Sequence, residues 1–585
     1  MRPSTSSDLS KNPGSVRGLP QQMNLYAATI RYNDVLMHNE GPKAEADAKT
    51  LGAYYTDAQV ADFLVRWAVR EKHEKILDPS FGGGVFLRSA SKRLADIGGS
   101  PIQVFGIELD QNVHSRVAEK LADEFDVPPC NLRHADFFTE PSSGVEVVVG
   151  NPPFIRYQRF AGDARKRGIA CAQQHGVRLS ELSSSWLPFL LHSISHLSAD
   201  GRLAMVIPVE LTYAAYARPA LDVLARTFRA VYLLTFRKKL FPDLSEDTLL
   251  LLAEGKGSGP AQFFLRDLAH ASTLAEFTDR RPKGLLRLNP QKIASGEERV
   301  IEHQISRKAR DLYRELKLNR LVSKLGDIAD VGIGYVTGAN DFFHLHPDAA
   351  RMWQIPRRNL RCAVRRGRSL SGVRFTKADW KKSLSDGETA YLLYVRPTDV
   401  ITDELSAYLR KGEASGVPRV YKCRVREPWY SVPHVYQPDA FLSYMSGATP
   451  RLVANDANAV APNSLHIVRL SKTTTLDAED LAAVWKTSLT RLSAEIEGHS
   501  LGGGMLKLEP TEAENVLIAV PQTLRKHGLP SELDEILRTG GDQTAVECAD
   551  RAILHEDLGL SVADCELLRR AAESLRARRY DRATA

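Results

Sequence analysis

The tetrapeptide Asn151-Pro152-Pro153-Phe154 constrains the fold of this chain more than any other stretch. It follows a short apolar run, residues 145–150, whose length and valine content indicate a buried strand. Because proline has no backbone N–H and a fixed φ, two successive prolines cannot continue the hydrogen bonds of a sheet. We therefore expect the chain to leave the sheet stiffly at the carboxyl end of this strand, where open α/β sheets bind ligands.

The groups in this turn suit a flat ring that carries an amine. Asn151 offers a carbonyl oxygen and an NH₂ donor, Pro152 a backbone carbonyl, and Phe154 a flat aromatic face. Together they suit a planar heterocycle with an exocyclic amino group. Taken alone, however, such a tetrapeptide is more often a proline-rich turn that caps a strand, with its Phe in the core.

Earlier segments end in groups that suit a nucleotide. A strand-like run reaches Asp78 and breaks into a turn at Gly82, and glycines let the backbone approach a ligand closely. The next strand ends in Glu108, where an acid accepts bonds from ribose hydroxyls in nucleotide-binding folds. A third unit ends in Asp136 and Phe137. Each signal also has a purely structural explanation, since acids at strand ends are commonly solvated.

Helix signals separate these strands. Thr56 and Asp57 are good N-cap residues for a helix with apolar residues at helical spacing, and a second helix is expected from Val85. Further strands are expected at 202–208, 231–236 and 248–253, the last two joined by a segment short enough for an antiparallel return. The order predicts an α/β fold with a mostly parallel sheet.

The order of the motifs resembles the γ-class DNA adenine-N6 methyltransferases of restriction–modification systems. The residues that carry this resemblance are Tyr54-Tyr55-Thr56, Asp78 to Gly84, Glu108, Ala135-Asp136-Phe137 and Asn151 to Phe154. The resemblance covers residues 50–260. It implies a Rossmann-like class I fold that depends on S-adenosylmethionine, with a seven-stranded sheet, followed by a mixed α+β target-recognition domain. The implied reaction is methyl transfer to the N6 amine of an adenine flipped out of duplex DNA.

The resemblance also implies roles for individual positions. Asn151 and Pro152 would receive the amine of the target base, while Phe154 and Phe241 would stack on that base. Many relatives carry Tyr at the position of Phe154, so stacking is kept and a hydroxyl is lost. Asp136 would bind N6 of the cofactor's adenine, and Phe137 would stack on it. The other implied cofactor contacts are Thr56, Asp78, Gly82 and Glu108, and no metal is implied.

The second half of the chain contains a basic stretch. Residues 351–430 hold 18 Lys and Arg against 8 Asp and Glu, an excess of 18 − 8 = +10, with aromatic residues between them. This composition is typical of phosphate contacts and base readout, although a solvated basic face explains it too. Residues 421–430 and 502–510 are similar to target-recognition segments of the family. The candidate DNA contacts are Lys422, Arg424, Arg426 and Lys507, although the glycine-rich turn beside Lys507 could equally serve internal packing.

Composition and domain size complete the prediction. The chain has 585 residues, 43% of them apolar and 25% charged, and no run approaches a membrane span. Residues 1–22 lack the apolar core of a signal peptide, and six scattered cysteines without a C-x-x-C pair argue against a zinc site or disulfides. We expect a bacterial, cytoplasmic, nucleoid-associated protein. The predicted parts are a disordered or loosely attached segment (1–45), a catalytic domain (46–290), a helical linker (291–324) and a DNA target-recognition domain with an Arg-rich helical tail (325–585).

The expected partners are double-stranded DNA and a separate cognate restriction endonuclease. Three alternatives stay open: a methyltransferase acting on RNA adenine or a protein glutamine amide, a bifunctional restriction–modification enzyme, and an inactive DNA-binding module. Pro242-Asp243 and Glu254-Gly255-Lys256 nominally fit nuclease spacing. We interpret this match as chance, because residues 248–254 are needed as a strand.

Overall fold

The computed structural model describes residues 56–155, 159–180, 183–241, 247–276, 284–387, 389–521 and 528–583. The predicted N-terminal segment 1–45, Tyr54-Tyr55 and Pro242-Asp243 therefore lie outside the described residues. Within the described ranges, every helix is too short or too polar to cross a membrane.

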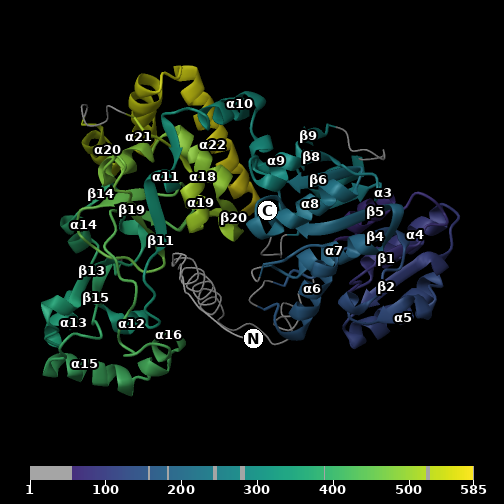
Figure 1. The fold of residues 1–585 in the computed structure, drawn as a ribbon, viewed down its shortest axis with the longest axis horizontal. Helices are drawn as coiled ribbons and strands as arrows, with labels where there is room; N and C mark the ends of the chain where they lie inside the picture. The colour runs from purple at the N-terminus through teal and green to yellow at the C-terminus, as the bar shows by residue number, and fades with distance from the viewer. Residues whose placement is uncertain are drawn as a thin grey trace, which may run out of the picture. The chain divides into compact units, whose positions relative to one another are not determined.

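A nine-stranded mixed sheet organises the first half of the chain (Figure 1). Its strand order is β3-β2-β1-β4-β5-β7-β6-β8-β9; the first five strands are parallel and β7 runs antiparallel between β5 and β6. The first seven strands follow the class I methyltransferase order, so the predicted α/β fold is confirmed. The strands are β1 Ile76–Asp78, β2 Val104–Glu108, β3 Leu132–His134, β4 Val145–Gly150, β5 Leu197–Pro208, β6 Ala230–Phe236, β7 Thr248–Glu254, β8 Gln262–Leu268 and β9 Leu286–Leu288.

The sheet has two strands more than predicted. β8 pairs parallel with β6, and β9 pairs antiparallel with β8. The pattern of β8 is half-buried and includes Arg266 and Asp267, so it lacks the continuous apolar run by which we identified the central strands.

Helices α3, α4, α5 and α7 pack against this sheet, α6 packs on α7, and α4 and α5 lie beside β1 and β2 (Figure 1). The first helix begins as expected, because the Asp57 side chain accepts a hydrogen bond from the Gln59 N–H at 2.8 Å. The helices are α3 Ala58–Ala68, α4 Val85–Asp96, α5 Gln111–Phe125, α6 Gly162–Gln174, α7 Trp186–His196, α8 Arg218–Thr227 and α9 Pro290–Ser295.

The second half is mixed α+β, as predicted, and is built on a five-stranded sheet of order β11-β19-β16-β18-β14. Two three-stranded sheets and one strand pair complete it. The strands are β10 Val322–Lys324, β11 Ala329–Ile333, β12 His344–Leu345, β13 Leu360–Val364, β14 Arg374–Phe375, β15 Thr389–Leu393, β16 Ala440–Ser443, β17 Met445–Ser446, β18 Leu452–Asn455, β19 Leu465–Leu470, β20 His499–Leu501, β21 Met505–Lys507 and β22 Leu517–Ala519. The helices are α10 Arg307–Leu316, α11 Leu325–Ile328, α12 Asn340–Phe343, α13 Pro347–Met352, α14 Lys377–Lys382, α15 Asp403–Ala414, α16 Tyr421–Arg424, α17 Ala478–Val484, α18 Ser488–Glu497, α19 Pro510–Asn515, α20 Leu529–Arg538, α21 Asp542–Ala549 and α22 Val562–Ala583.

The linker helix is shorter than predicted. A 3₁₀ turn at Val300–Gln304 precedes α10, because the Ser306 side chain caps the Ala309 N–H at 3.3 Å and starts a new helix there. One apolar core runs from Val60 to Val300, and separate cores begin at Ile305. The domain limits themselves remain predictions.

The predicted Arg-rich tail is the helix α22, and it is anchored by ion pairs. The Arg578 guanidinium binds the Asp267 carboxylate of β8, and Arg579 binds Glu495 of α18 at 2.9 Å. Burial raises the pKa of Asp267, but the hydrogen bond and charge of Arg578, with hydrogen bonds from Thr235 and Arg237, together outweigh burial and hold the pKa below its usual value. The tail helix is therefore attached to the first-half sheet through a charge-assisted contact.

We expect Arg578→Ala to lower the free energy of unfolding by roughly 2–3 kcal/mol. This is somewhat less than the cost of removing one partner from a fully buried ion pair. The reason is that the Asp267 side chain is only 19% exposed and would lose its main cation. Arg570→Ala is the matched control, because Arg570 lies on the same helix with 75% of its side chain exposed and is paired with Glu566. Urea unfolding of both variants tests this, and equal midpoints would contradict the anchoring role.

Candidate active site

The candidate site lies where β1 and β4 end side by side. These strands pair in parallel, so Asp78 at the end of β1 and Asn151 just after β4 meet at the same sheet edge. A Cβ built on Gly150 would lie 3.0 Å from the Asp78 Oδ1 atom. The close approach of the two strand ends therefore favours glycine at position 150, because a larger residue would push the Asp78 carboxyl aside. The sheet order also reverses between β1 and β4, which is where α/β folds bind ligands.

The Asn151 side chain is oriented by one neighbour and has one unused acceptor. Its Nδ2 donates to Thr56 Oγ1 at 3.2 Å, while its Oδ1 is buried and has no hydrogen-bond partner among the described residues. A buried polar atom without a partner costs roughly 1–3 kcal/mol. Such an atom suits a ligand that brings an N–H or O–H donor. Thr56, predicted to contact the cofactor, holds the Asn151 amide in this structure.

Ser185 clamps the turn after β4, and our sequence analysis missed it. It precedes α7, donates its hydroxyl hydrogen to the Pro153 carbonyl and accepts from the Ile155 N–H at 2.8 Å. Its own N–H donates to the Ile155 carbonyl at 3.0 Å. The only sequence signal was a serine run immediately before an apolar helix. This clamp adds to the rigidity that Pro152 and Pro153 impose.

Both predicted base-stacking rings are buried. Phe154 is 7% exposed and Phe241 8% exposed, and both belong to the apolar core of the first half. Their roles toward a base remain predictions.

The Gly82 turn is tied to the end of β2 by Glu108. The Glu108 carboxylate accepts from the Gly82 N–H and from the Asp110 N–H, both at 2.9 Å. Gly84, at φ +76°, begins α4, and a Cβ there would lie 2.6 Å from Val117 Cγ1. The structure thus brings two predicted cofactor residues, Gly82 and Glu108, into direct contact.

Asp78 is a buried carboxyl group with a strongly shifted pKa. It is 0% exposed; Oδ1 accepts from the Ser80 N–H at 3.1 Å, and Oδ2 has no partner among the described residues. Burial raises its pKa to about 8; the Ser80 hydrogen bond opposes this shift, and the nearby Glu108 charge adds to it. At neutral pH Asp78 is therefore mostly protonated and able to donate a hydrogen bond.

Asp136 and Phe137 point to different environments. Asp136 accepts from Arg167 Nε of α6 at 2.8 Å and caps the Phe138 N–H at 3.0 Å. Phe137 is 2% exposed and stacks on Phe189 and His196 of α7, with ring centroids 5.2 and 5.0 Å apart. The turn after Asp136 directs Phe137 into the core, and its stacking on the cofactor remains a prediction.

Of the predicted DNA contacts, some are exposed at the surface and others bind groups of the protein itself. Arg424 is exposed, and it and Lys422 lie over the Tyr421 ring at 5.8 and 5.7 Å. Arg426 instead donates to the backbone carbonyls of Thr337, at 2.8 Å, and Val336.

Lys507 also makes its contacts within the protein. Its ammonium pairs with Glu509 and lies 5.2 Å from the Tyr444 ring centroid. Burial lowers its pKa, but the charges and hydrogen bonds of Glu509 and Tyr444 together outweigh burial and raise the pKa. The Gly504 carbonyl beside it accepts from Arg579. The Gly504 end of the glycine-rich turn thus takes part in internal packing, and contact of the turn with phosphate remains a prediction.

Comparison with known proteins agrees with this arrangement. Residues 35–218 match the family model described as N-6 DNA Methylase, and residues 297–554 match that of the C-terminal domain of the type II methyltransferase M.Eco57I. The chain fits the γ-class N6 methyltransferases of restriction–modification systems. The predicted resemblance is thereby confirmed.

Individual relatives are similar over most of their length. The type II methyltransferase M.AccI of Acinetobacter calcoaceticus is 23% identical over 484 residues, which is 79% of this chain and 84% of the relative. M.XamI of Xanthomonas campestris pv. amaranthicola is 24% identical over 505 residues, covering 80% of this chain and 85% of the relative. The crystal structure of the type IIG restriction endonuclease BpuSI matches with a TM-score of 0.41 and 15% identity, over 91% of this chain and 66% of that one.

The described part of the nominal nuclease match, Glu254 and Lys256, has structural partners. Glu254 of β7 pairs with Arg70 at 2.8 Å and accepts from the Tyr232 hydroxyl at 3.0 Å. Lys256 donates to the backbone carbonyls of Leu197 and Ser195. These contacts hold the sheet, in agreement with our interpretation of the spacing as chance.

We expect Asp78 to make the ligand-free protein less stable as the pH rises from about 4 to about 8. In that window the unfolded chain has lost the proton, at the usual Asp value near 4, while the folded chain still holds it. Asp78→Asn cannot lose this proton. The difference between its free energy of unfolding and that of the wild type should therefore grow by up to about 1.4 kcal/mol for each pH unit. Denaturant unfolding across this range measures it, and parallel curves would contradict the buried neutral carboxyl.

Proposed function

We propose that the chain is a site-specific DNA methyltransferase that transfers the methyl group of S-adenosylmethionine to the N6 amine of an adenine flipped out of duplex DNA. The observation that carries this proposal is the buried Oδ1 of Asn151, which has no partner among the described residues and lies at the β1–β4 edge beside Asp78. The match to the N-6 DNA methylase family supports it.

The chemistry explains why an amide and a carbonyl are needed. An adenine N6 amine is a poor nucleophile, because its lone pair is delocalised into the ring. Asn151 Oδ1 and the Pro152 carbonyl would each accept one of its two hydrogens, which favours a pyramidal nitrogen with its lone pair directed at the methyl group. Such acceptors are most effective when they are already in place for the transition state.

The surroundings of the turn keep these acceptors in place. Thr56 orients the Asn151 amide, and Ser185 clamps Pro153 and Ile155 to α7. Holding the amine in line with the methyl donor converts a bimolecular reaction into an effectively unimolecular one. The donor would bind at the neighbouring strand ends through Asp78, Gly82, Glu108 and Asp136.

The proposed substrate is duplex DNA, with a separate endonuclease acting on the same site. Extruding a base costs a few kcal/mol, and stacking on an aromatic ring such as Phe154 or Phe241 returns about 1–3 kcal/mol per base. Because both rings are buried, they would have to become accessible when the base enters. RNA adenine and a protein glutamine amide present the same nitrogen chemistry and are the competing acceptors.

We expect Asn151→Ala to lower the rate of methyl transfer by at least roughly 10²–10³-fold, as for loss of one preorganised polar group in a catalytic site. Cofactor affinity should change little, because the donor contacts lie on other residues. Asn515→Ala is the control, since Asn515 ends α19 in the second half, is only half-buried, and bonds to the Thr511 carbonyl and the Lys324 ammonium. Transfer of labelled methyl to DNA, with cofactor binding by calorimetry, tests the role; full activity of Asn151→Ala would refute it.

We expect Arg424 and Arg426 to affect DNA binding differently. Arg424→Ala should reduce the slope of log affinity against log salt concentration by about 0.9, the value for one lost phosphate contact. Arg426→Ala should leave that slope unchanged and destabilise the fold, because Arg426 binds the carbonyls of Val336 and Thr337. Titrations of labelled duplex at several salt concentrations distinguish them; an unchanged slope for Arg424→Ala would exclude a phosphate contact there.

A further inference from the structure

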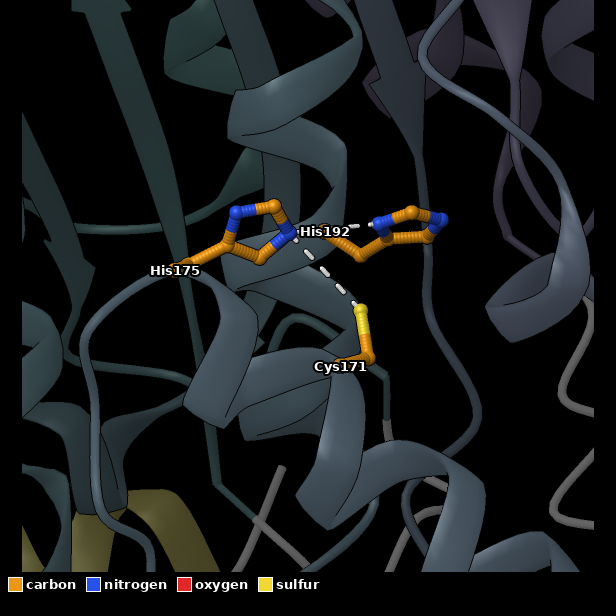
Figure 2. Close-up of side chains that lie close together, drawn as sticks. All are labelled: Cys171, His175 and His192. Carbon is orange, nitrogen blue, oxygen red and sulfur yellow. Dashed lines mark hydrogen bonds between the residues drawn. The ribbon is translucent and has the colours of Figure 1, made fainter.

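Helices α6 and α7 bring a thiol and two imidazoles together (Figure 2). Cys171 and His175 are four residues apart at the end of α6, so both side chains lie on one face of the helix. His192 comes from α7, and in Figure 2 its ring lies beside that of His175 with the Cys171 sulfur below. This spacing was missed because we searched only for C-x-x-C pairs.

The distances fit a tetrahedral metal centre. His175 Nε2 is 3.4 Å from His192 Nδ1 and 3.8 Å from Cys171 Sγ, and all three ligand atoms lie within 4.8 Å of one another. Zinc bonds of about 2.0–2.1 Å to nitrogen and about 2.3 Å to sulfur imply tetrahedral edges of about 3.4 Å between nitrogens and about 3.6 Å between nitrogen and sulfur. The cluster is therefore close to the geometry that a zinc ion requires.

The outer contacts of His192 also suit a ligand. Its Nε2 lies 3.1 Å from the Glu140 carbonyl, so a proton on Nε2 leaves the Nδ1 lone pair facing His175. The Ser195 hydroxyl also lies 3.2 Å from Nδ1, but it can donate to the His192 carbonyl at 2.6 Å instead. Metal-bound histidines usually donate their second N–H to a backbone carbonyl or carboxylate in this way. His196 Nε2 also approaches His192 Nε2, at 3.2 Å, and is therefore on the side away from the cluster.

Burial keeps both imidazoles in the form that binds metal. It lowers the pKa of His175 and of His192, so both are neutral at physiological pH. The nearby Lys256 charge lowers the pKa of His175 further. Burial raises the pKa of the Cys171 thiol to about 11, so a metal would bind with release of the thiol proton to solvent.

We propose that Cys171, His175 and His192 form a zinc site, with a water molecule as the fourth ligand. A thiolate with imidazoles is the donor set that zinc prefers. The site joins α6, whose Arg167 pairs with Asp136, to α7, which begins at the Ser185 clamp. A bound ion would thus hold together the two helices behind the candidate cofactor and target-base residues. The proposal stands independently of methyl transfer.

Metal content and a cobalt spectrum test the site on the untagged full chain. We expect about one zinc per chain after equilibration in a zinc buffer, and in the cobalt(II) form a thiolate-to-metal charge-transfer band. Cys171→Ala should abolish that band and weaken zinc binding by more than the roughly 10–100-fold typical of losing an outer contact. Cys548→Ala, which removes another buried thiol, should do neither.

His175→Gln against the exposed His270→Gln gives a second matched pair. Circular dichroism verifies that each variant is folded. If Cys171→Ala does not fold, the cobalt spectrum of the wild type decides whether the thiolate binds the metal. A wild-type chain that takes up no zinc, a cobalt complex without the thiolate band, or equal zinc affinity in folded Cys171→Ala would each overturn the proposal.

Discussion

The close contact between the ends of β1 and β4 is the constraint on which the site depends. Gly150 lets the Asp78 carboxyl approach the β4 backbone, and the two prolines then direct the chain out of the sheet. This contact buries two oxygen atoms, Asp78 Oδ2 and Asn151 Oδ1, that have no partner among the described residues. A stable core usually pairs such atoms, so the fold keeps an unfavourable local arrangement where a ligand would relieve it.

The supporting contacts come from elements far apart in the sequence. Thr56 orients Asn151, Glu108 holds the Gly82 turn, and Ser185 fixes the backbone after Pro153. The proposed zinc site supports these contacts indirectly, by joining α6 to α7. The rigidity of the site, which includes the Gly82 turn and the turn after β4, therefore depends on Thr56 before α3, on β2 and on Ser185 before α7.

Local patterns were enough to predict seven of the nine strands of the sheet and the residues at their ends. The strands through β7, the α3 N-cap and the α22 helix could be read from apolar runs and capping residues. Side-chain partners could not, because they join distant segments: Lys507 lies over the Tyr444 ring, Arg426 binds the Thr337 carbonyl, and Phe137 stacks on His196 of α7. Basic or aromatic composition alone does not distinguish such internal contacts from a nucleic-acid surface.

The measurement that tests the account most directly is to incubate the purified chain with plasmid DNA and methyl-labelled S-adenosylmethionine, and to map the modified bases by sequencing. The account predicts label on adenine N6 within one recurring short sequence. Label on cytosine, on RNA or on protein but not DNA, or no incorporation by protein that binds the cofactor, would contradict it.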